Sequence, residues 1–221
     1  MGGFSLIELM IALTIMLMVS LVSVQISANV FSTNTQLIHM TQLTGELRSA
    51  IQIISRDIRR AGYNADALAG FLTTQAIDSG VTMGTVDDAG AAECVHVTYD
   101  DISRGQSGVQ ANVVYRLRTV SGVGRLSVLF GDEDDDYSCD TAITDTDWVD
   151  LSDPLLVDIS ALQFIHNDSL TDIAENLNNG HMIQVGIEQI SITITATLRS
   201  NDTISRTITN EVQIRNQYLR V

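Results

Sequence analysis

The N-terminal part of the chain carries a long apolar run. Residues 4–31 are predominantly apolar, and after Glu8 no Asp, Glu, Lys or Arg occurs until Glu46. About 20 apolar residues suffice for a helix to span a bilayer. The pattern predicts a membrane-spanning helix over residues 4–31. A cleaved secretory signal peptide is the alternative, but the run is long, lacks a basic flank before it and contains Glu8.

A second apolar pattern continues the predicted helix beyond the membrane. Apolar side chains recur three or four positions apart, at Met40, Leu43, Leu47, Ile51, Ile54, Ile58 and Ala61. This spacing marks one face of an amphipathic helix. Gly62 is the expected C-cap, following arginines in a last turn where the helix dipole favours cations. The amphipathic half is therefore expected over residues 32–62.

The remaining residues, 63–221, show the alternation that is typical of strands. Strands are expected around residues 95–99, 109–117, 126–130 and 155–164. Residues 64–93 and 165–182 are rich in Gly, Ala and Asn and are expected to form loops or short helices.

The clearest strand pair lies near the C-terminus. Apolar side chains occupy every second position from Ile190 to Leu198, and Ser or Thr occupies the positions between them. After a turn near Ser200–Asp202, apolar residues return at Ile204, Ile208, Val212 and Ile214. This predicts an antiparallel hairpin with one buried face, which would cover the apolar stripe of the helix. The expected fold is α+β, with a long N-terminal helix packed on an antiparallel sheet.

Composition limits the classes of function. The 221 residues suit one membrane segment and one globular domain. The net charge is −15, and all 12 basic residues are arginine. Such a surface repels phosphate backbones, so direct binding to nucleic acid is not expected.

Three segments carry a resemblance to a known superfamily. The run Gly3-Phe4-Ser5-Leu6-Ile7-Glu8 resembles the processing and assembly signature of type IV prepilins and type II secretion pseudopilins. The segments 55–63 (Ser-Arg-Asp-Ile-Arg-Arg-Ala-Gly-Tyr) and 211–217 resemble PilW-like minor pilins and their J-type pseudopilin relatives. The family's helix-kinking proline is missing here, since the only proline is Pro154.

The resemblance implies specific roles. Residues 1–3 would be a leader that a prepilin peptidase removes by cutting between Gly3 and Phe4, with methylation of the new amine of Phe4. Glu8 would neutralise the N-terminal amine of a neighbouring subunit. The protein would wait in the inner membrane with residues 63–221 as a periplasmic head. It would then join an extracellular pilus or a periplasmic pseudopilus.

Two cysteines fall in the part that the anchor would place outside the cytoplasm. In an oxidising compartment Cys94 and Cys139 are expected to form a disulfide. Two buried free thiols are the alternative.

A carboxylate-rich segment contains the candidate metal ligands. Asp132, Asp134 and Asp136 alternate as in a calcium loop, with Asp140 or Asp145 as additional ligands. Tyr137 and Ile143 stand where an EF-hand needs glycine and glutamate, so an EF-hand is excluded. A solvated acidic loop is the favoured interpretation, with a looser calcium site as the alternative, and no other cofactor is expected.

Other candidate chemistry is weak. The histidines at 39, 96, 166 and 181 lack the spacing of zinc ligands. No Gly-x-Ser-x-Gly elbow or phosphate-binding glycine loop is present, so an enzymatic role is not expected. Arg56, Asp57, Arg59 and Arg60 are interpreted as a surface ion network, with a docking patch as the alternative.

The predicted function is structural. The sequence favours a subunit of a type IV pilus-like filament, most like a PilW-like minor pilin that acts in pilus assembly or initiation. The alternatives are a J-type minor pseudopilin of type II secretion, the main filament subunit, and a membrane-anchored periplasmic binding or adhesion domain that never polymerises.

Overall fold

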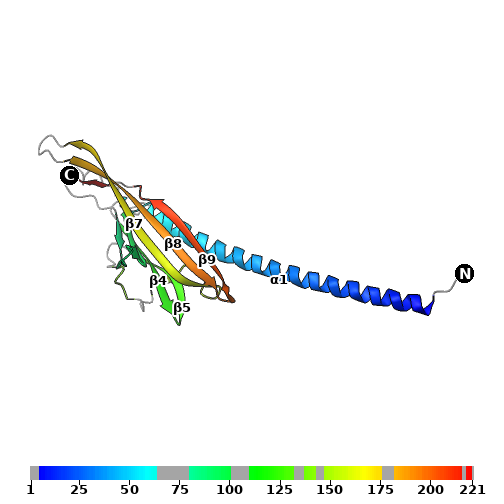
Figure 1. Cartoon of the computed structure of the whole chain (residues 1–221). Coiled ribbons are helices and arrows are strands. Elements are labelled where there is room, and N and C mark those ends of the chain that lie inside the picture. Colours follow the sequence, from blue (N-terminus) through cyan, green and yellow to red (C-terminus); the bar gives the residue numbers. More distant parts are fainter. Residues whose placement is uncertain are drawn as a thin grey trace. The chain divides into compact units, whose positions relative to one another are not determined.

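The computed structural model describes residues 5–63, 80–100, 110–131, 137–142, 147–175, 182–215 and 218–220. Residues 1–42 and 43–221 form two compact units. One helix, α1 (Leu6–Ile58), contributes to both units, and the strands β1–β10 belong to the second (Figure 1). The expected α+β architecture, a long apolar N-terminal helix with antiparallel sheets, is confirmed.

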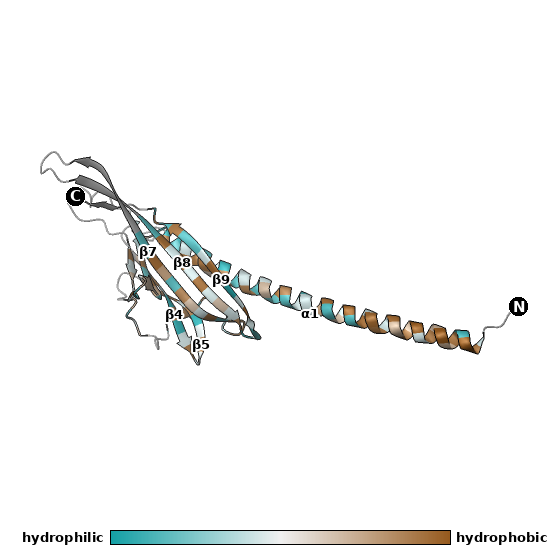
Figure 2. Ribbon diagram, in the orientation of Figure 1, coloured by the Kyte–Doolittle hydropathy of each residue, from teal (hydrophilic) through white to brown (hydrophobic). Residues whose placement is uncertain are grey.

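The first part of α1 is apolar, and its side chains are exposed. Figure 2 shows the hydrophobic colouring concentrated in this part of the helix. Its large apolar side chains are exposed, from Leu6 (76%) to Ile38 (56%). The helix is long and apolar enough to cross a membrane. It runs without a break because no proline interrupts residues 6–58.

The second part of α1 has a buried face. Leu43, Leu47, Ile51, Ile54 and Ile58 are buried, as their spacing predicts. Met40, the first residue of the predicted stripe, is 43% exposed, so the expectation was wrong at this position. Met40 belongs to the first compact unit, and the second begins at Leu43.

Two antiparallel sheets form the rest of the second unit. One sheet has the order β1-β3-β4-β5-β6, and its strands are β1 (Val81–Met83), β3 (Cys94–Asp100), β4 (Gln110–Val120), β5 (Val123–Gly131) and β6 (Val149–Asp150). The other has the order β10-β8-β7-β2, with β9 also paired to β8. Its strands are β2 (Ala91–Ala92), β7 (Val157–Glu175), β8 (Met182–Leu198), β9 (Asn201–Gln213) and β10 (Tyr218–Arg220).

The predicted C-terminal hairpin is confirmed as β8 and β9. Ile194 pairs with Ile208 and Ile190 with Val212, and the register shifts between Thr197 and Leu198 beside the turn. On the opposite face, the hydroxyl groups of Thr193 and Thr209 lie 3.0 Å apart. The apolar face of the hairpin therefore turns to the core and the hydroxyl face to solvent.

The expectation of loops or short helices over residues 165–182 was wrong for residues 165–175 and for Met182, whereas residues 176–181 lie outside the described residues. Strand β7 continues to Glu175 and β8 begins at Met182, with Asn167 opposite Gln189 and Glu175 opposite Met182. Polar residues dominate residues 166–175 of β7, so the period-two apolar signal is absent from this strand segment. Pairing with the partner strand extends the chain here, and a bulge lies between Asp172 and Ala174. Within 64–93, residues 81–83 and 91–92 are short strands.

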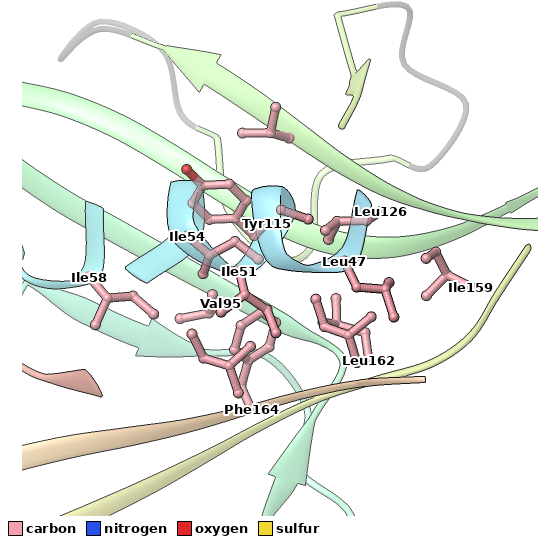
Figure 3. Packing of buried hydrophobic residues seen from close by; sticks show 14 of the residues in the cluster. Leu47, Ile51, Ile54, Ile58, Val95, Tyr115, Leu126, Ile159, Leu162 and Phe164 are labelled. Atoms are coloured by element: carbon pink, nitrogen blue, oxygen red, sulfur yellow. The ribbon is translucent and has the colours of Figure 1, made fainter. Parts of the chain in front are cut away.

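The main core joins α1 to both sheets (Figure 3). Leu47 and Ile54 of the helix are packed in one cluster with Tyr115 of β4 and with Phe164 of β7. Ile190, Ile192 and Ile194 of β8 belong to the same cluster. The apolar stripe is thus covered by the C-terminal hairpin, as predicted, and also by the other sheet.

The C-terminal end of α1 is closed by glycine. The chain tightens after Ile58, with the amide of Ala61 bonded to the carbonyl of Ile58. Gly62 then takes a left-handed conformation (φ 67°) and donates its amide to the carbonyl of Thr98. The predicted C-cap at Gly62 is confirmed, and it ties the helix end to β3.

Candidate functional site

Glu8 caps the N-terminus of α1. Ser5 precedes the first helical residue, and its amide donates a 3.2 Å hydrogen bond to Oε2 of Glu8. A glutamate at the third helical position that accepts from the N-cap amide is half of a capping box. The negative charge also lies at the positive end of the helix dipole. Gly3 and Phe4, between which cleavage is predicted, lie outside the described residues.

Several serine and threonine side chains of this part of the helix bond to its own backbone. The hydroxyl groups of Ser23, Ser27, Thr33 and Thr35 each donate to the carbonyl four residues earlier, and Thr14 donates to Ile11. Such hydroxyl groups need no partner in a lipid or protein environment. Glu8 differs because one hydrogen bond does not neutralise its charge. Within residues 5–45 it is the one side chain that calls for a cation.

A buried carboxylate joins the helix to the sheet at the other end of α1. Asp57 is 1% exposed, and its Oδ2 accepts a 2.5 Å hydrogen bond from the hydroxyl of Tyr115. Burial, the negative charge of Asp57 and this hydrogen bond raise the pKa of Tyr115. The surface ion network expected for Arg56–Arg60 was therefore wrong for Asp57. Its position seven residues after the buried Ala50 and three after Ile54 places it on the buried face.

Two further contacts involve the same segment. Nε of Arg56 lies 3.2 Å from Oδ1 of Asp57, and this carboxylate raises the pKa of Arg56 through a hydrogen bond and its charge. Nδ2 of Asn210 donates a 2.9 Å hydrogen bond to Oγ of Ser55. No local sequence pattern indicates these contacts of Tyr115, Ser55 and Asn210, which join residues distant in the chain. Segment 55–63 is thus the junction between α1, β4 and β9.

A disulfide joins the two cysteines. The sulfur atoms of Cys94 and Cys139 are 2.09 Å apart, and the bridge closes a separation of 45 residues. Cys94 belongs to a second, smaller core with Val114, Leu129 and Trp148. Arg116 donates a 2.9 Å hydrogen bond to the carbonyl of Cys139. The bridge therefore fixes residues 137–142 against the first sheet.

Of the candidate calcium ligands, only Asp140 falls within the described residues. Asp132, Asp134, Asp136 and Asp145 lie outside the described residues, and Asp140 is described and exposed. Within the part of the chain that the structure describes, no group of three His, Cys, Asp or Glu side chains could hold a metal ion.

The described histidines lie apart. His96 bonds to the side chain of Asn112, and Nε2 of His166 lies 3.5 Å from Oε2 of Glu188. His39 lies on α1, and His181 is outside the described residues. These contacts give His96 and His166 local, structural partners, and the described histidines do not gather into one site.

Comparison with known protein families gives a match over most of the chain. A family model described as prepilin peptidase-dependent protein B matches residues 36–214, which contain the second half of α1 and nearly all of the sheets. No curated protein and no solved structure matches the chain. The matched range excludes Glu8, so the geometry at Ser5 and Glu8 is independent of that match.

Proposed function

Because the chain belongs to the prepilin peptidase-dependent protein B family, we propose that it is a structural subunit of a type IV pilus-like filament. Within that class we propose a PilW-like minor pilin that acts in pilus assembly or initiation. Its reaction partner would be the prepilin peptidase, which would cut between Gly3 and Phe4. The subunit itself would perform no catalysis and need no cofactor.

Glu8 on the exposed apolar part of α1 is the observation that carries the proposal. A carboxylate in the hydrocarbon of a bilayer costs at least about 2.5–3.5 kcal/mol. Its hydrogen bond to the amide of Ser5 offsets part of this cost but leaves the charge. A cationic partner at the same depth removes the rest. The freed amine of another subunit, one residue before Ser5 in the processed chain, is a cation of that kind.

The mechanism would be assembly through helix packing. Before assembly, lipid would cover the apolar side chains from Leu6 to Ile38, which have no partner within the described residues. In the filament, the same side chains would pack against the helices of neighbouring subunits. Attraction between Glu8 and the N-terminal amine would fix the axial register, because a shift by one helical turn separates the charges by about 5.4 Å.

An anchored domain that never polymerises is the strongest alternative of another class. The hydrogen bond from Ser5 favours it, since a capped Glu8 has a role within a single chain. A J-type minor pseudopilin of type II secretion and a main filament subunit are alternatives within the superfamily. Both would use Glu8 in the same way.

Replacement of Glu8 by alanine separates assembly from anchoring. We expect Glu8→Ala to insert into membranes normally and to be depleted from sheared filaments, measured as the ratio of filament to membrane protein. Thr14→Ala is the matched control, since the hydroxyl of Thr14 bonds to the carbonyl of Ile11 in its own helix. Equal incorporation of Glu8→Ala and wild type would support the non-polymerising anchor. Mass spectrometry of the wild type should find a methylated N-terminal Phe4.

A further inference from the structure

Four of the 12 arginines gather at one place on the head. Arg56, Arg59 and Arg60 from the end of α1 and Arg215 after β9 line a hollow of about 510 Å³, with Ser55 and Asn210 in its wall. A second hollow of about 500 Å³ continues from it and shares Arg59 and Arg215. We call this continuous surface the arginine groove. It is a basic surface on a chain whose net charge is −15.

The fold accounts for only part of this cluster. Asp57 engages Arg56, and the guanidinium of Arg60 lies 5.8 Å from the centre of the Tyr99 ring. The helix dipole favours Arg59 and Arg60 near the C-terminus of α1, but it does not explain Arg215. Among the described residues, no hydrogen bond or ion pair engages the guanidinium groups of Arg59 and Arg215. Glu211, the one carboxylate among the described lining residues, accepts instead from Gln189.

The wall of the groove is held in place by the core. Oγ of Ser55 accepts the hydrogen bond from Asn210, and the buried Asp57 is fixed by Tyr115. The α1 side and the β9 side of the groove are therefore joined below its surface. The guanidinium groups of Arg59 and Arg215, which have no partner within the described ranges, suit carboxylates, because arginine binds a carboxylate in a forked, two-bond geometry.

The same chain contains a ligand of matching charge. Residues 132–136 read Asp-Glu-Asp-Asp-Asp, five consecutive carboxylates without a basic residue between them. We propose that the arginine groove receives this acidic run from a second copy of the chain. The contact holds two heads together and does not involve Glu8. If this contact is disproved, the proposed function as a filament subunit is unaffected. If the proposed function is disproved, the contact between two heads can still exist.

The disulfide favours a second copy over the same one. Successive side chains of a strand point to opposite faces, so Tyr115 and Val114 of β4 face opposite ways. Tyr115 reaches Asp57 under the arginine groove, whereas Val114 packs in the cluster that contains Cys94 and Cys139. In sequence the acidic run is followed directly by Tyr137, which packs against this second cluster together with Cys139, on the face of β4 away from the groove.

A peptide-binding measurement on the full chain in detergent micelles tests the contact. The probe is a fluorescent peptide with the sequence of residues 131–137, and the matched control peptide carries Asn or Gln in place of its acids. We expect saturable binding of the acidic peptide only. The double substitution Arg59→Gln/Arg215→Gln should weaken it by about tenfold or more. Raising the salt from about 50 to about 300 mM should also weaken it, because the groove is exposed.

Arg206→Gln is the control variant, because Arg206 is an exposed arginine of β9 that does not line the groove. The affinity of this variant for the acidic peptide should stay within about twofold of that of the wild type. Equal binding of the two peptides, or equal losses in the control and the double variant, would overturn the proposal. Displacement by inorganic phosphate at the same concentration would also overturn it, as it would indicate a general anion site. A further variant of the full chain carries Asn or Gln at residues 132–136. If this variant binds the acidic peptide tenfold more tightly than the wild type, the acidic run competes for the groove of its own chain, and the proposed contact with a second copy is wrong.

Discussion

The hydroxyl of Tyr115 donates a hydrogen bond of 2.5 Å to the carboxylate of Asp57, 58 residues earlier in the chain. Both side chains are buried, at 0% and 1% exposure. A buried carboxylate is unfavourable unless hydrogen bonds satisfy it. Asp57 therefore fixes how the end of α1 meets β4, since rotation of the helix would remove its donor. The arginine groove and the helix–sheet junction depend on this contact.

Removal of the Tyr115 hydroxyl should destabilise the head. We expect Tyr115→Phe to lower the free energy of unfolding by about 1–3 kcal/mol, since Asp57 stays buried without this donor. Denaturant unfolding of the detergent-solubilised chain can be followed by the fluorescence of Trp148, the only tryptophan. The double variant Tyr115→Phe/Asp57→Leu should lose less than the sum of the single changes, because both remove one interaction. Strict additivity would contradict the assigned contact.

The same pair predicts loss of stability at high pH. Burial raises the pKa of Tyr115 above its ordinary value of 10.0. Above that pH the unfolded state releases the phenolic proton while the folded state keeps it, so the free energy of unfolding falls as pH rises. The contribution is fully present below about pH 10. Other tyrosines also titrate in this range. The measurement is therefore the difference in the free energy of unfolding between the wild type and Tyr115→Phe, taken at about pH 8 and at about pH 11. We expect this difference to be smaller at the higher pH. An equal difference at both pH values would contradict the raised pKa of Tyr115 in the folded protein.

The sequence was sufficient for the helix, the C-terminal hairpin and their apolar contact, because both patterns have a clear period. The two faces that meet in the core are the apolar face of α1, from Leu43 to Ile58, and the apolar face of β8, from Ile190 to Leu198. Asp57 was misplaced because its charge suggests the surface, although its helical position lies on the buried face. Residues 165–175 of β7 could not be recognised, since cross-strand pairing extends a stretch with no apolar alternation. The partners Tyr115 and Asn210 depend on tertiary contacts over 58 and 155 residues, which local pattern does not encode.

Loss of the disulfide should lower stability without changing the helix–sheet core. In the chain-entropy model, a bridge over 45 residues contributes about 3–4 kcal/mol. We expect Cys94→Ala/Cys139→Ala to unfold at lower denaturant concentration by a corresponding amount. Reductant should lower the stability of the wild type in the same way and leave the double variant unchanged. Mass mapping without reduction should find the two cysteines in one linked peptide pair, and unlinked peptides would contradict the bridge.

Alanine substitutions at three glycines should distinguish the cost of a steric clash from the cost of a left-handed backbone conformation. A Cβ on Gly80 (φ 70°) would lie 2.1 Å from the backbone nitrogen of Gly62, whereas one on Gly122 (φ 77°) or Gly45 would meet nothing within 4 Å. Gly80→Ala should therefore lower the free energy of unfolding by more than about 2 kcal/mol, and Gly122→Ala by about 1–2 kcal/mol from the left-handed conformation alone. Gly45→Ala, inside α1, should raise stability by up to about 1 kcal/mol. The denaturant midpoint should therefore be highest for Gly45→Ala, lower for Gly122→Ala and lowest for Gly80→Ala. This order tests the close approach of Gly80 to Gly62, which joins the end of α1 to the sheet. If Gly80→Ala is no worse than Gly122→Ala, Gly62 and Gly80 are not in contact.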